Sequence, residues 1–305
     1  MWWRFLVSTW VRQQAQQTLQ SLMAEALRGE APTTRGGATS PRQGGTAAAP
    51  ASAPTDEPRP PCSIAFLLAL DLEAAGIVER LRDRRQVRRA SYVEHDGFLR
   101  QSRVIVAETG VGQTAARQAA ADLIALHRPA WVVSAGFAGG LVDSLRRGHF
   151  VMPEQVVGES GDVFSVGLKI PAEVLAAQKT LHTGRLVTVD RLIRQTAQRQ
   201  ELAVRYEAVA CDMETWSVAA ECARQRTRFL SVRIVTDALD DVLPAEIENL
   251  LEQKSLAGKI GAVTGALLNR PSSVKDLWQL YEEAQRSSTR LGQFLTGVAA
   301  QLSGV

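Results

Sequence analysis

Four short apolar runs constrain the fold of this 305-residue chain more than any other feature. They span residues 64–70, 104–107, 131–134 and 229–235, and each passes within two residues into glycine or acidic residues. Continuous apolar runs of this length are typical of strands buried on both faces of an α/β sheet. Because ligands bind outside the carboxyl ends of such strands, we expect the residues that follow the runs to meet in one pocket.

Carboxylates follow two of these runs, and a third acidic group precedes the last of them. Glu73 follows the first run, Asp237 ends the fourth, and Asp212 and Glu214 flank Met213 at the head of a predicted helix. An arrangement of this kind can hold a ribose and protonate a leaving base. A single Asp at a strand end is also typical of a helix cap or a turn, so the pattern alone leaves both interpretations open.

Glycines follow the other two runs. Gly110 and Gly112 form a G-x-G turn before a small-residue helix predicted from Gln113, and a glycine-rich stretch spans residues 136–140. The first motif lacks the third glycine and the acidic residue of a dinucleotide site, which excludes a Rossmann cofactor site. Tight strand-to-helix turns explain both motifs, and backbone N–H groups that approach polar ligand atoms explain them equally well.

Six segments occur in an order and context that characterise one family: residues 68–73 (LALDLE), 109–112 (TGVG), 135–141 (AGFAGGL), 148–152 (GHFVM), 212–214 (DME) and 233–237 (RIVTD). Together they resemble the nucleoside phosphorylase/nucleosidase superfamily, and within it the 5′-methylthioadenosine/S-adenosylhomocysteine nucleosidase branch. The resemblance extends over residues 63 to about 268. It implies a three-layer α/β/α sandwich with a mixed, partly barrel-like central sheet, a homodimer, and no metal or organic cofactor.

The resemblance also implies roles for individual residues. Asp237 is expected to protonate N7 of the departing purine, and Glu73 to activate water for attack on the anomeric carbon. Two carboxyl groups in opposite protonation states suit this chemistry. Glu214 and Met213 are expected to hold the ribose. Further substrate contacts are expected at Asp212, Phe137, Ala138, Gly139, Gly112, Arg233 and Ile193, with strand alternation placing Arg233 on the same face as Val235 and Asp237.

Departures from the family pattern leave the substrate open. Phe137 stands where these nucleosidases carry serine, and residues 148–186 lack their aromatic loop. These features resemble the hopanoid-associated branch, which removes adenine from adenosylhopane. Phosphorolysis is the alternative reaction, but Asp71 and Glu73 stand where phosphorylases need a phosphate-binding arginine, so hydrolysis is favoured. A catalytically silent nucleoside-binding protein is the other alternative.

Composition restricts the remaining possibilities. The net charge is only +3, and the basic residues of 80–89 and 191–199 lack interleaved aromatic residues, which predicts a solvated face and no nucleic-acid site. Cys62, Cys211 and Cys222 have no metal-ligand spacing, and none of the four histidines belongs to a plausible ligand set. The odd cysteine count is typical of a reducing cytoplasm.

The chain divides into four predicted parts. Residues 1–28 have the apolar spacing of an amphipathic helix rich in Trp, which suits either packing on protein or peripheral contact with the inner face of the membrane. Residues 29–61 lack large apolar side chains and are predicted to be a disordered linker. Residues 62–270 form the predicted catalytic domain. A helical tail follows over 271–305, where core packing is favoured over a cover for the pocket or a dimer seam.

Overall fold

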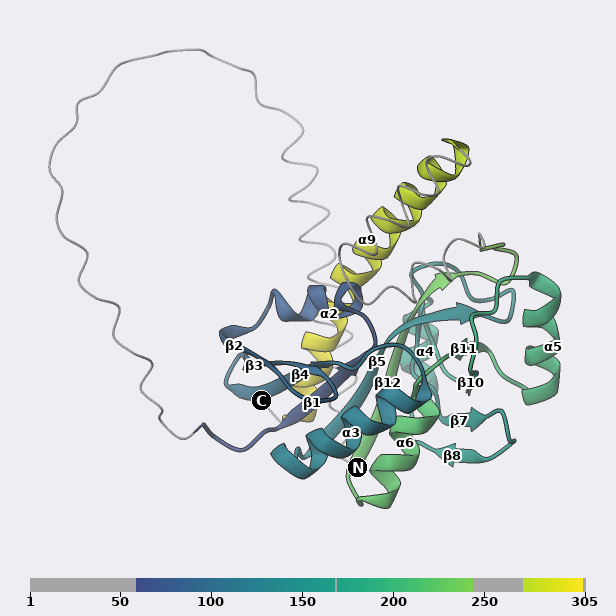
Figure 1. Ribbon diagram of the computed structural model, residues 1–305. Coiled ribbons are helices and arrows are strands. Elements are labelled where there is room, and N and C mark those ends of the chain that lie inside the picture. Colours follow the sequence, from purple (N-terminus) through teal and green to yellow (C-terminus); the bar gives the residue numbers. More distant parts are fainter. Residues whose placement is uncertain (1–58, 168, 244–270, 304–305) are drawn as a thin grey trace, which may run out of the picture. The chain divides into compact units, whose positions relative to one another are not determined.

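The computed structural model describes residues 59–167, 169–243 and 271–303 (Figure 1). The predicted helix over 1–28 and almost all of the predicted linker lie outside these ranges. Residues 61–305 belong to one compact unit, and the fold is that of this unit. None of the helices in the described ranges has the length and apolar character needed to cross a membrane.

A mixed sheet forms the middle layer, and over the described residues it has twelve strands in the main order β2-β3-β4-β1-β5-β11-β10-β7-β8. Helices cover it, as Figure 1 shows, so the predicted fold class is confirmed. The strand bounds are β1 Ile64–Leu68, β2 Arg82–Arg88, β3 Val93–Leu99, β4 Ser102–Glu108, β5 Trp131–Gly140, β6 Phe150–Val151, β7 Gln155–Gly158, β8 Val163–Ser165, β9 Leu181–His182, β10 Arg185–Thr188, β11 Ala210–Asp212 and β12 Arg228–Asp237.

The four apolar runs of the sequence form the parallel centre of this sheet. β1 pairs in parallel with β4 on one side and β5 on the other, and β12 pairs in parallel with β5. All five residues of β1 are buried, because helices pack on both of its faces. The carboxyl ends of β1, β4, β5 and β12 therefore lie at the same edge of the sheet.

β5 is the branch point that gives the sheet its partly barrel-like form. Besides β1 and β12 it pairs with β11 in antiparallel orientation, and β12 continues to the short strands β6 and β9. The ladder between β12 and β5 has an irregularity between Val235 and Asp237. The extra residue, Thr236, interrupts strand alternation, so the predicted shared face does not extend from Arg233 and Val235 to Asp237.

The helices have the bounds α2 Asp71–Val78, α3 Gln113–His127, α4 Ala172–Ala177, α5 Thr196–Tyr206, α6 Thr215–Arg224 and α9 Pro271–Leu302. α3 and α6 share an apolar cluster with Ala65 and Leu67 of β1. Two residues separate β1 from α2, and α2 packs along α9. The predicted C-terminal tail is thus a single helix, and its Leu291, Phe294, Leu295 and Val298 are buried as the apolar spacing indicated.

α2 and α9 approach each other through glycine. A Cβ atom on Gly76 of α2 would lie 2.0 Å from the carbonyl oxygen of Ser288, and one on Gly292 of α9 would lie 2.1 Å from the carbonyl carbon of Gly76. The Ser288 hydroxyl also accepts a hydrogen bond from the Gly76 N–H at 3.0 Å. α9 is therefore a support for the helix that carries Glu73.

Candidate active site

Glu73 lies in the first turn of α2 and is 4% exposed. Its Oε2 accepts hydrogen bonds from the N–H groups of Ala69 (2.9 Å) and Leu70 (3.0 Å), and its Oε1 accepts one from the Phe137 N–H (2.7 Å). The bonds to 69 and 70 cap the helix, and the helix macrodipole favours a negative charge there. The bond to Phe137 joins α2 to β5, so the carboxylate bridges two of the converging strand ends.

Arg233 of β12 lies beside this carboxylate, since a Cβ atom on Gly136 would meet both the Arg233 guanidinium and Glu73 Oε1. Its Nη2 forms an ion pair with Asp212 Oδ2 at 2.6 Å and also donates to Ser134 and Thr215. Both ion-pair partners are buried, and Arg233 is the counter-charge for the acidic residues around it.

Asp212 is held at the end of β11 by hydrogen bonds to both oxygens. The Thr188 hydroxyl donates to Oδ1 at 2.6 Å, and the N–H of Thr215, the first residue of α6, donates to Oδ2 at 3.0 Å. Together with the ion pair to Arg233, these bonds occupy the carboxylate from three sides. These contacts therefore hold the Asp212 side chain in a fixed position.

Glu214, at the N-cap of α6, accepts a hydrogen bond at Oε1 from the Gly112 N–H at 2.9 Å. This bond joins the glycine turn after β4 to the acidic segment after β11. Gly112 has φ +94°, a left-handed conformation that favours glycine, so the turn that presents its N–H depends on this residue. Hydrogen bonds thus link the end of β1 to β5 and the end of β4 to the segment after β11, while the single pocket at these strand ends stays a prediction.

The acidic residues differ in their electrostatics. Burial, together with the neighbouring charges of Asp212 and Glu73, raises the pKa of Glu214 to about 8 against the opposing effect of Arg233. Burial also raises the pKa of Glu73, but Arg233 and the three backbone N–H donors lower it. Burial is the largest effect on both groups and the pKa of each is raised, but the backbone N–H donors and Arg233 stabilise the ionised form of Glu73 in particular.

Asp237 ends β12 and is buried beside a different cation. Its Oδ2 lies 2.5 Å from Nη2 of Arg199, a residue of α5 with no exposed surface, and the Thr236 hydroxyl donates to its Oδ1 at 2.8 Å. Burial raises the pKa of Asp237, whereas the Arg199 guanidinium lowers it. Asp237 thus has its own electrostatic environment, distinct from that of the pair formed by Arg233 and Asp212.

Gly139 of β5 lies between β11, which ends at Asp212, and β12, which ends at Asp237. Its register partners are Cys211 on β11 and Asp237 on β12. A Cβ atom on Gly139 would lie 2.9 Å from Asp237 Oδ2 and 3.2 Å from the Cys211 sulfur. Burial raises the pKa of Cys211 to about 12, so the sulfur beside Gly139 is a neutral thiol. Glycine at this position allows the Asp237 carboxyl group to lie against the sheet.

The remaining predicted site residues fall into two groups. Met213, Phe137, Gly139 and Gly112 are half-buried and provide the partly open surface beside the carboxylates. The methyl group of Ala138 packs in the core with Val235, and the Ile193 side chain belongs to a second apolar cluster. The Ile193 carbonyl oxygen nevertheless accepts a hydrogen bond from Arg199 at 3.2 Å, which places its backbone beside the Asp237 group.

Sequence reasoning missed Arg199. The segment 191–199 was expected to be a solvated basic face, and this is wrong for Arg199, which is fully buried because Asp237 and two carbonyl groups surround its guanidinium. A signal was present in the sequence. Arg199, Leu202, Ala203 and Tyr206 have the i, i+3, i+4, i+7 spacing of a buried helix face, and all four pack inward.

The histidines also have partners that the sequence did not reveal. His149 and His182 form a hydrogen bond of 2.9 Å between their rings, His95 bonds Glu108, and His127 bonds Glu94. None of these pairs touches Glu73, Glu214 or Asp237 in the described hydrogen bonds. The exposed strand β2, over Arg82–Arg88, agrees with the expected solvated face.

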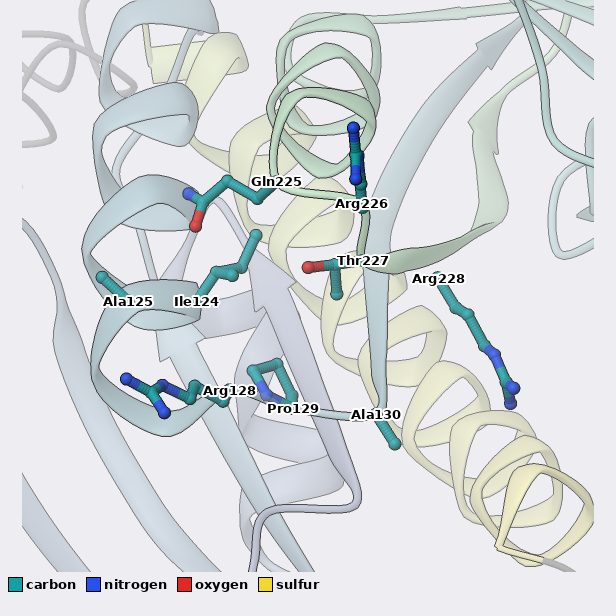
Figure 2. Close-up of a pocket in the computed structure, with 9 residues that line it drawn as sticks. All are labelled: Ile124, Ala125, Arg128, Pro129, Ala130, Gln225, Arg226, Thr227 and Arg228. Atoms are coloured by element: carbon teal, nitrogen blue, oxygen red, sulfur yellow. The ribbon is translucent and has the colours of Figure 1, made fainter.

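A cavity of about 660 Å³ lies at the opposite end of the central strands, where β5 and β12 begin (Figure 2). It is lined by Ile124, Ala125, Arg128, Pro129, Ala130, Gln225, Arg226, Thr227 and Arg228. Figure 2 shows the three arginine side chains pointing away from one another. Because they do not converge on a common point, this cavity lacks the geometry of an anion site and is separate from the acidic residues.

Comparison with known proteins gives the family to which this fold belongs. Residues 63–268 match the phosphorylase superfamily, and the chain belongs to this family. It is 28% identical over 211 residues to a 5′-methylthioadenosine/S-adenosylhomocysteine nucleosidase of Colwellia psychrerythraea, covering 60% of this chain and 87% of the relative. The nucleosidase of Staphylococcus epidermidis is 23% identical over 64% of this chain and 94% of its own length.

Solved structures show the same fold. A Helicobacter pylori nucleosidase of this type, a mutant with 5′-methylthioadenosine in its active site, has a TM-score of 0.59 at 17% identity and covers 80% of this chain and 99% of its own. A futalosine hydrolase mutant from the same organism also has a TM-score of 0.59, at 18% identity, over 80% of this chain and 100% of its own. The chain is thus a phosphorylase-superfamily enzyme with a distant likeness to these nucleosidases.

Proposed function

We propose that the protein is a nucleosidase that hydrolyses the N-glycosidic bond of a 5′-modified adenosine and releases adenine. Asp237 donates a proton to N7 of the purine as the bond to the anomeric carbon breaks. Glu73 accepts a proton from the water that attacks that carbon. Glu214 and Met213 hold the ribose, and Glu214 takes its hydroxyl groups.

The observation that carries the proposal is the separation of two buried carboxyl groups into different environments. Glu73 accepts three backbone N–H bonds, which stabilise its ionised form and suit a base. Burial raises the pKa of Asp237, which has no backbone N–H donors in the described hydrogen bonds, and a raised pKa suits an acid. A purine anion is a poor leaving group, and an acid and a base held apart in this way remove that difficulty.

Glu214 is the third buried carboxyl group with a role in the proposed reaction. With a pKa of about 8 it is protonated at neutral pH, and its carboxylic acid can both donate to and accept from ribose hydroxyl groups. A binding protein that held a nucleoside without reacting would need only such polar contacts. The presence of a separate acid and base favours catalysis over silent binding.

Hydrolysis is favoured over phosphorolysis by the charges around the first strand. Asp71 and Glu73 follow β1 directly, and the one guanidinium described beside Glu73, that of Arg233, is paired with Asp212. A phosphate dianion placed there would be repelled by the carboxylates, whereas a neutral water molecule would not. The two relatives described above are both named nucleosidases, and the chain matches them over 87% and 94% of their length.

The proposal can be tested by measuring free adenine. The protein is incubated with methylthioadenosine, adenosylhomocysteine or an adenosylated lipid, each with and without phosphate. We expect release without phosphate from at least one of them, and release that depends on phosphate contradicts hydrolysis. Phe137, which stands where the resembled nucleosidases carry serine, favours large apolar 5′ substituents. Much faster turnover of methylthioadenosine than of any larger substrate contradicts that substrate class.

Asp237→Asn is the matched variant for this assay. Its amide keeps the shape of the side chain and cannot donate the proton, so release should fall by about 10²–10⁴-fold while the nucleoside still binds. Asp240→Asn changes an exposed acid three residues away and should leave the rate unchanged. Wild-type turnover by the Asp237 variant removes this residue from the mechanism.

A further inference from the structure

Arg199 joins two segments of the site from a position on α5. Its guanidinium lies 2.5 Å from Asp237 Oδ2 through Nη2, contacts the Ile193 carbonyl oxygen through Nη2 and Nε at 3.2 and 3.4 Å, and donates through Nη1 to the Ala238 carbonyl oxygen. The side chain has no exposed surface. Because a buried guanidinium is costly unless its donors are satisfied, this set of contacts holds Arg199 in one orientation.

We propose that Arg199 is a positioning residue for Asp237, reserving Oδ2 so that the transferable proton is carried on Oδ1, and stabilising the carboxylate left after transfer. The inference rests on the proposed function, because it concerns the acid of that reaction. It assigns to α5 a part in catalysis that goes beyond the roles of Asp237 and Glu73.

The two oxygens of Asp237 have partners of different kinds. A guanidinium has donors only, so the oxygen that faces Arg199 has to act as an acceptor. The partner of Oδ1 is the Thr236 hydroxyl at 2.8 Å, which can rotate and can either donate or accept. A proton on Asp237 is therefore directed to Oδ1, the oxygen that Arg199 leaves unoccupied.

The charge of Arg199 acts on the proton transfer itself. When the proton moves from Oδ1 to purine N7 and the electron pair of the glycosidic bond passes to the base, Asp237 becomes a carboxylate inside the protein. The guanidinium stabilises that carboxylate, whereas burial alone would make the carboxyl group too weak an acid. Arg199 thus opposes the effect of burial without exposing the acid to water.

Other charged groups around Asp237 do not replace Arg199. Asp241 and Arg147 are the next charged neighbours, but they form an ion pair with each other at 2.7 Å. Cys211, on the neighbouring strand, is held as a neutral thiol. Among these groups Arg199 is the one whose positive charge is directed at the Asp237 carboxyl group.

The test is the pH profile of kcat/KM for full-length wild type, Arg199→Gln and Arg199→Lys, with Arg185→Gln as the matched control. Arg185 is half-buried and donates to the Tyr206 carbonyl oxygen at the other end of α5. Its loss therefore reports what the weaker anchoring of the helix does by itself. The alkaline limb of the profile reports the loss of the proton from the catalytic acid.

In Arg199→Gln we expect the plateau to fall by about 10–100-fold and the alkaline limb to move to higher pH, because the acid becomes weaker. A lower plateau with an unmoved limb shows that Arg199 is structural only and overturns the proposal. Arg199→Lys keeps the charge and should keep the wild-type limb. If Arg199→Gln does not fold, a shift of the alkaline limb of Arg199→Lys to higher pH overturns the proposal instead.

A second readout separates this inference from the proposed function. The Asp237 carboxyl carbon can be followed by ¹³C NMR in protein labelled at aspartate, with its signal identified by its loss in Asp237→Asn. Titration should occur at higher pH in Arg199→Gln than in wild type, and equal titration overturns the inference. Absence of adenine release by the wild type contradicts the proposed function and leaves this comparison intact.

Discussion

At the scale of residues, the acidic side chains of the site are distinguished by what each one faces. Glu73 faces backbone N–H groups, Asp212 faces Arg233 and two threonines, Glu214 faces a glycine turn, and Asp237 faces Arg199. Carboxyl groups that lie close together cannot all be ionised. These different partners give Glu73, Glu214 and Asp237 different electrostatic environments.

Glu73→Gln should lose both activity and stability. Its amide nitrogen would face a backbone N–H donor, because the two oxygens of Glu73 accept three such bonds. We expect about 10²–10⁴-fold slower adenine release and a loss of about 1–3 kcal/mol in the free energy of unfolding. Asp71→Asn, at an exposed position of the same turn, is the control. An unchanged rate in Glu73→Gln points to another base.

Glu214 should make the protein less stable as the pH rises. Its pKa is raised from the ordinary value of 4.5 to about 8 in the folded protein, so between these values the folded state holds a proton that the unfolded state has lost. The contribution of Glu214 to the free energy of unfolding therefore falls across that range and levels above about pH 8. Melting temperatures of wild type and Glu214→Gln at pH 5 and pH 8 measure it. A difference between the two proteins that does not change with pH contradicts this assignment.

At the scale of elements, the contact between α2 and α9 supports the helix that carries Glu73. Alanine at Gly76 would gain about 1 kcal/mol in helix propensity. Its Cβ would also lie 2.0 Å from the Ser288 carbonyl oxygen, a clash with backbone that cannot be relieved by a side-chain rotation. We expect the clash to win and to lower the free energy of unfolding by about 1–3 kcal/mol. Chemical denaturation measures this, with exposed Gln293→Ala as control. Stabilisation by Gly76→Ala shows that the helices are not in close contact.

The sequence allowed much of this arrangement to be predicted, for a physical reason. Strands buried on both faces must be apolar throughout, so β1, β4, β5 and β12 were visible as apolar runs, and their parallel pairing brought Glu73, Gly112 and Asp237 to one edge. The apolar spacing of Leu291 to Val298 likewise revealed the buried face of α9.

The features that were missed depend on contacts between distant segments. The partner of Arg199 is 38 positions away on another element, and a basic residue in a polar segment does not show by itself that it is buried. The irregularity at Thr236 follows from how β12 pairs with β5, which no local pattern in β12 determines. The pairing of Arg233 with Asp212 also became visible only once β11 and β12 were placed beside β5.

At the scale of the whole molecule, the N-terminal segment and the catalytic unit have different compositions. Residues 1–28 carry Trp2, Trp3, Phe5 and Trp10 beside Arg4 and Arg12, and they lie outside the described residues. Tryptophan favours the headgroup region of a bilayer, where an apolar ring and a polar N–H are both accommodated. A peripheral membrane contact would bring the enzyme close to a lipid nucleoside and would bring no benefit for a soluble metabolite.

Full-length protein should therefore co-sediment with anionic vesicles, whereas a protein that begins at Cys62 should remain in the supernatant and stay active. The compact unit from Pro61 to Val305 contains the described acidic residues, which is why activity should survive the truncation. Equal partitioning of the two proteins assigns residues 1–28 to packing on protein. Loss of activity on truncation would show that the removed N-terminal residues are needed for catalysis.

In the proposed reaction, water activated at Glu73 attacks the sugar as Asp237 protonates and releases the purine. Mass spectrometry of the sugar product formed in H₂¹⁸O with saturating phosphate tests it most directly. We predict a free sugar with one ¹⁸O atom at the anomeric carbon and no sugar phosphate. A sugar 1-phosphate without the label would show that phosphate is the nucleophile and would contradict the account.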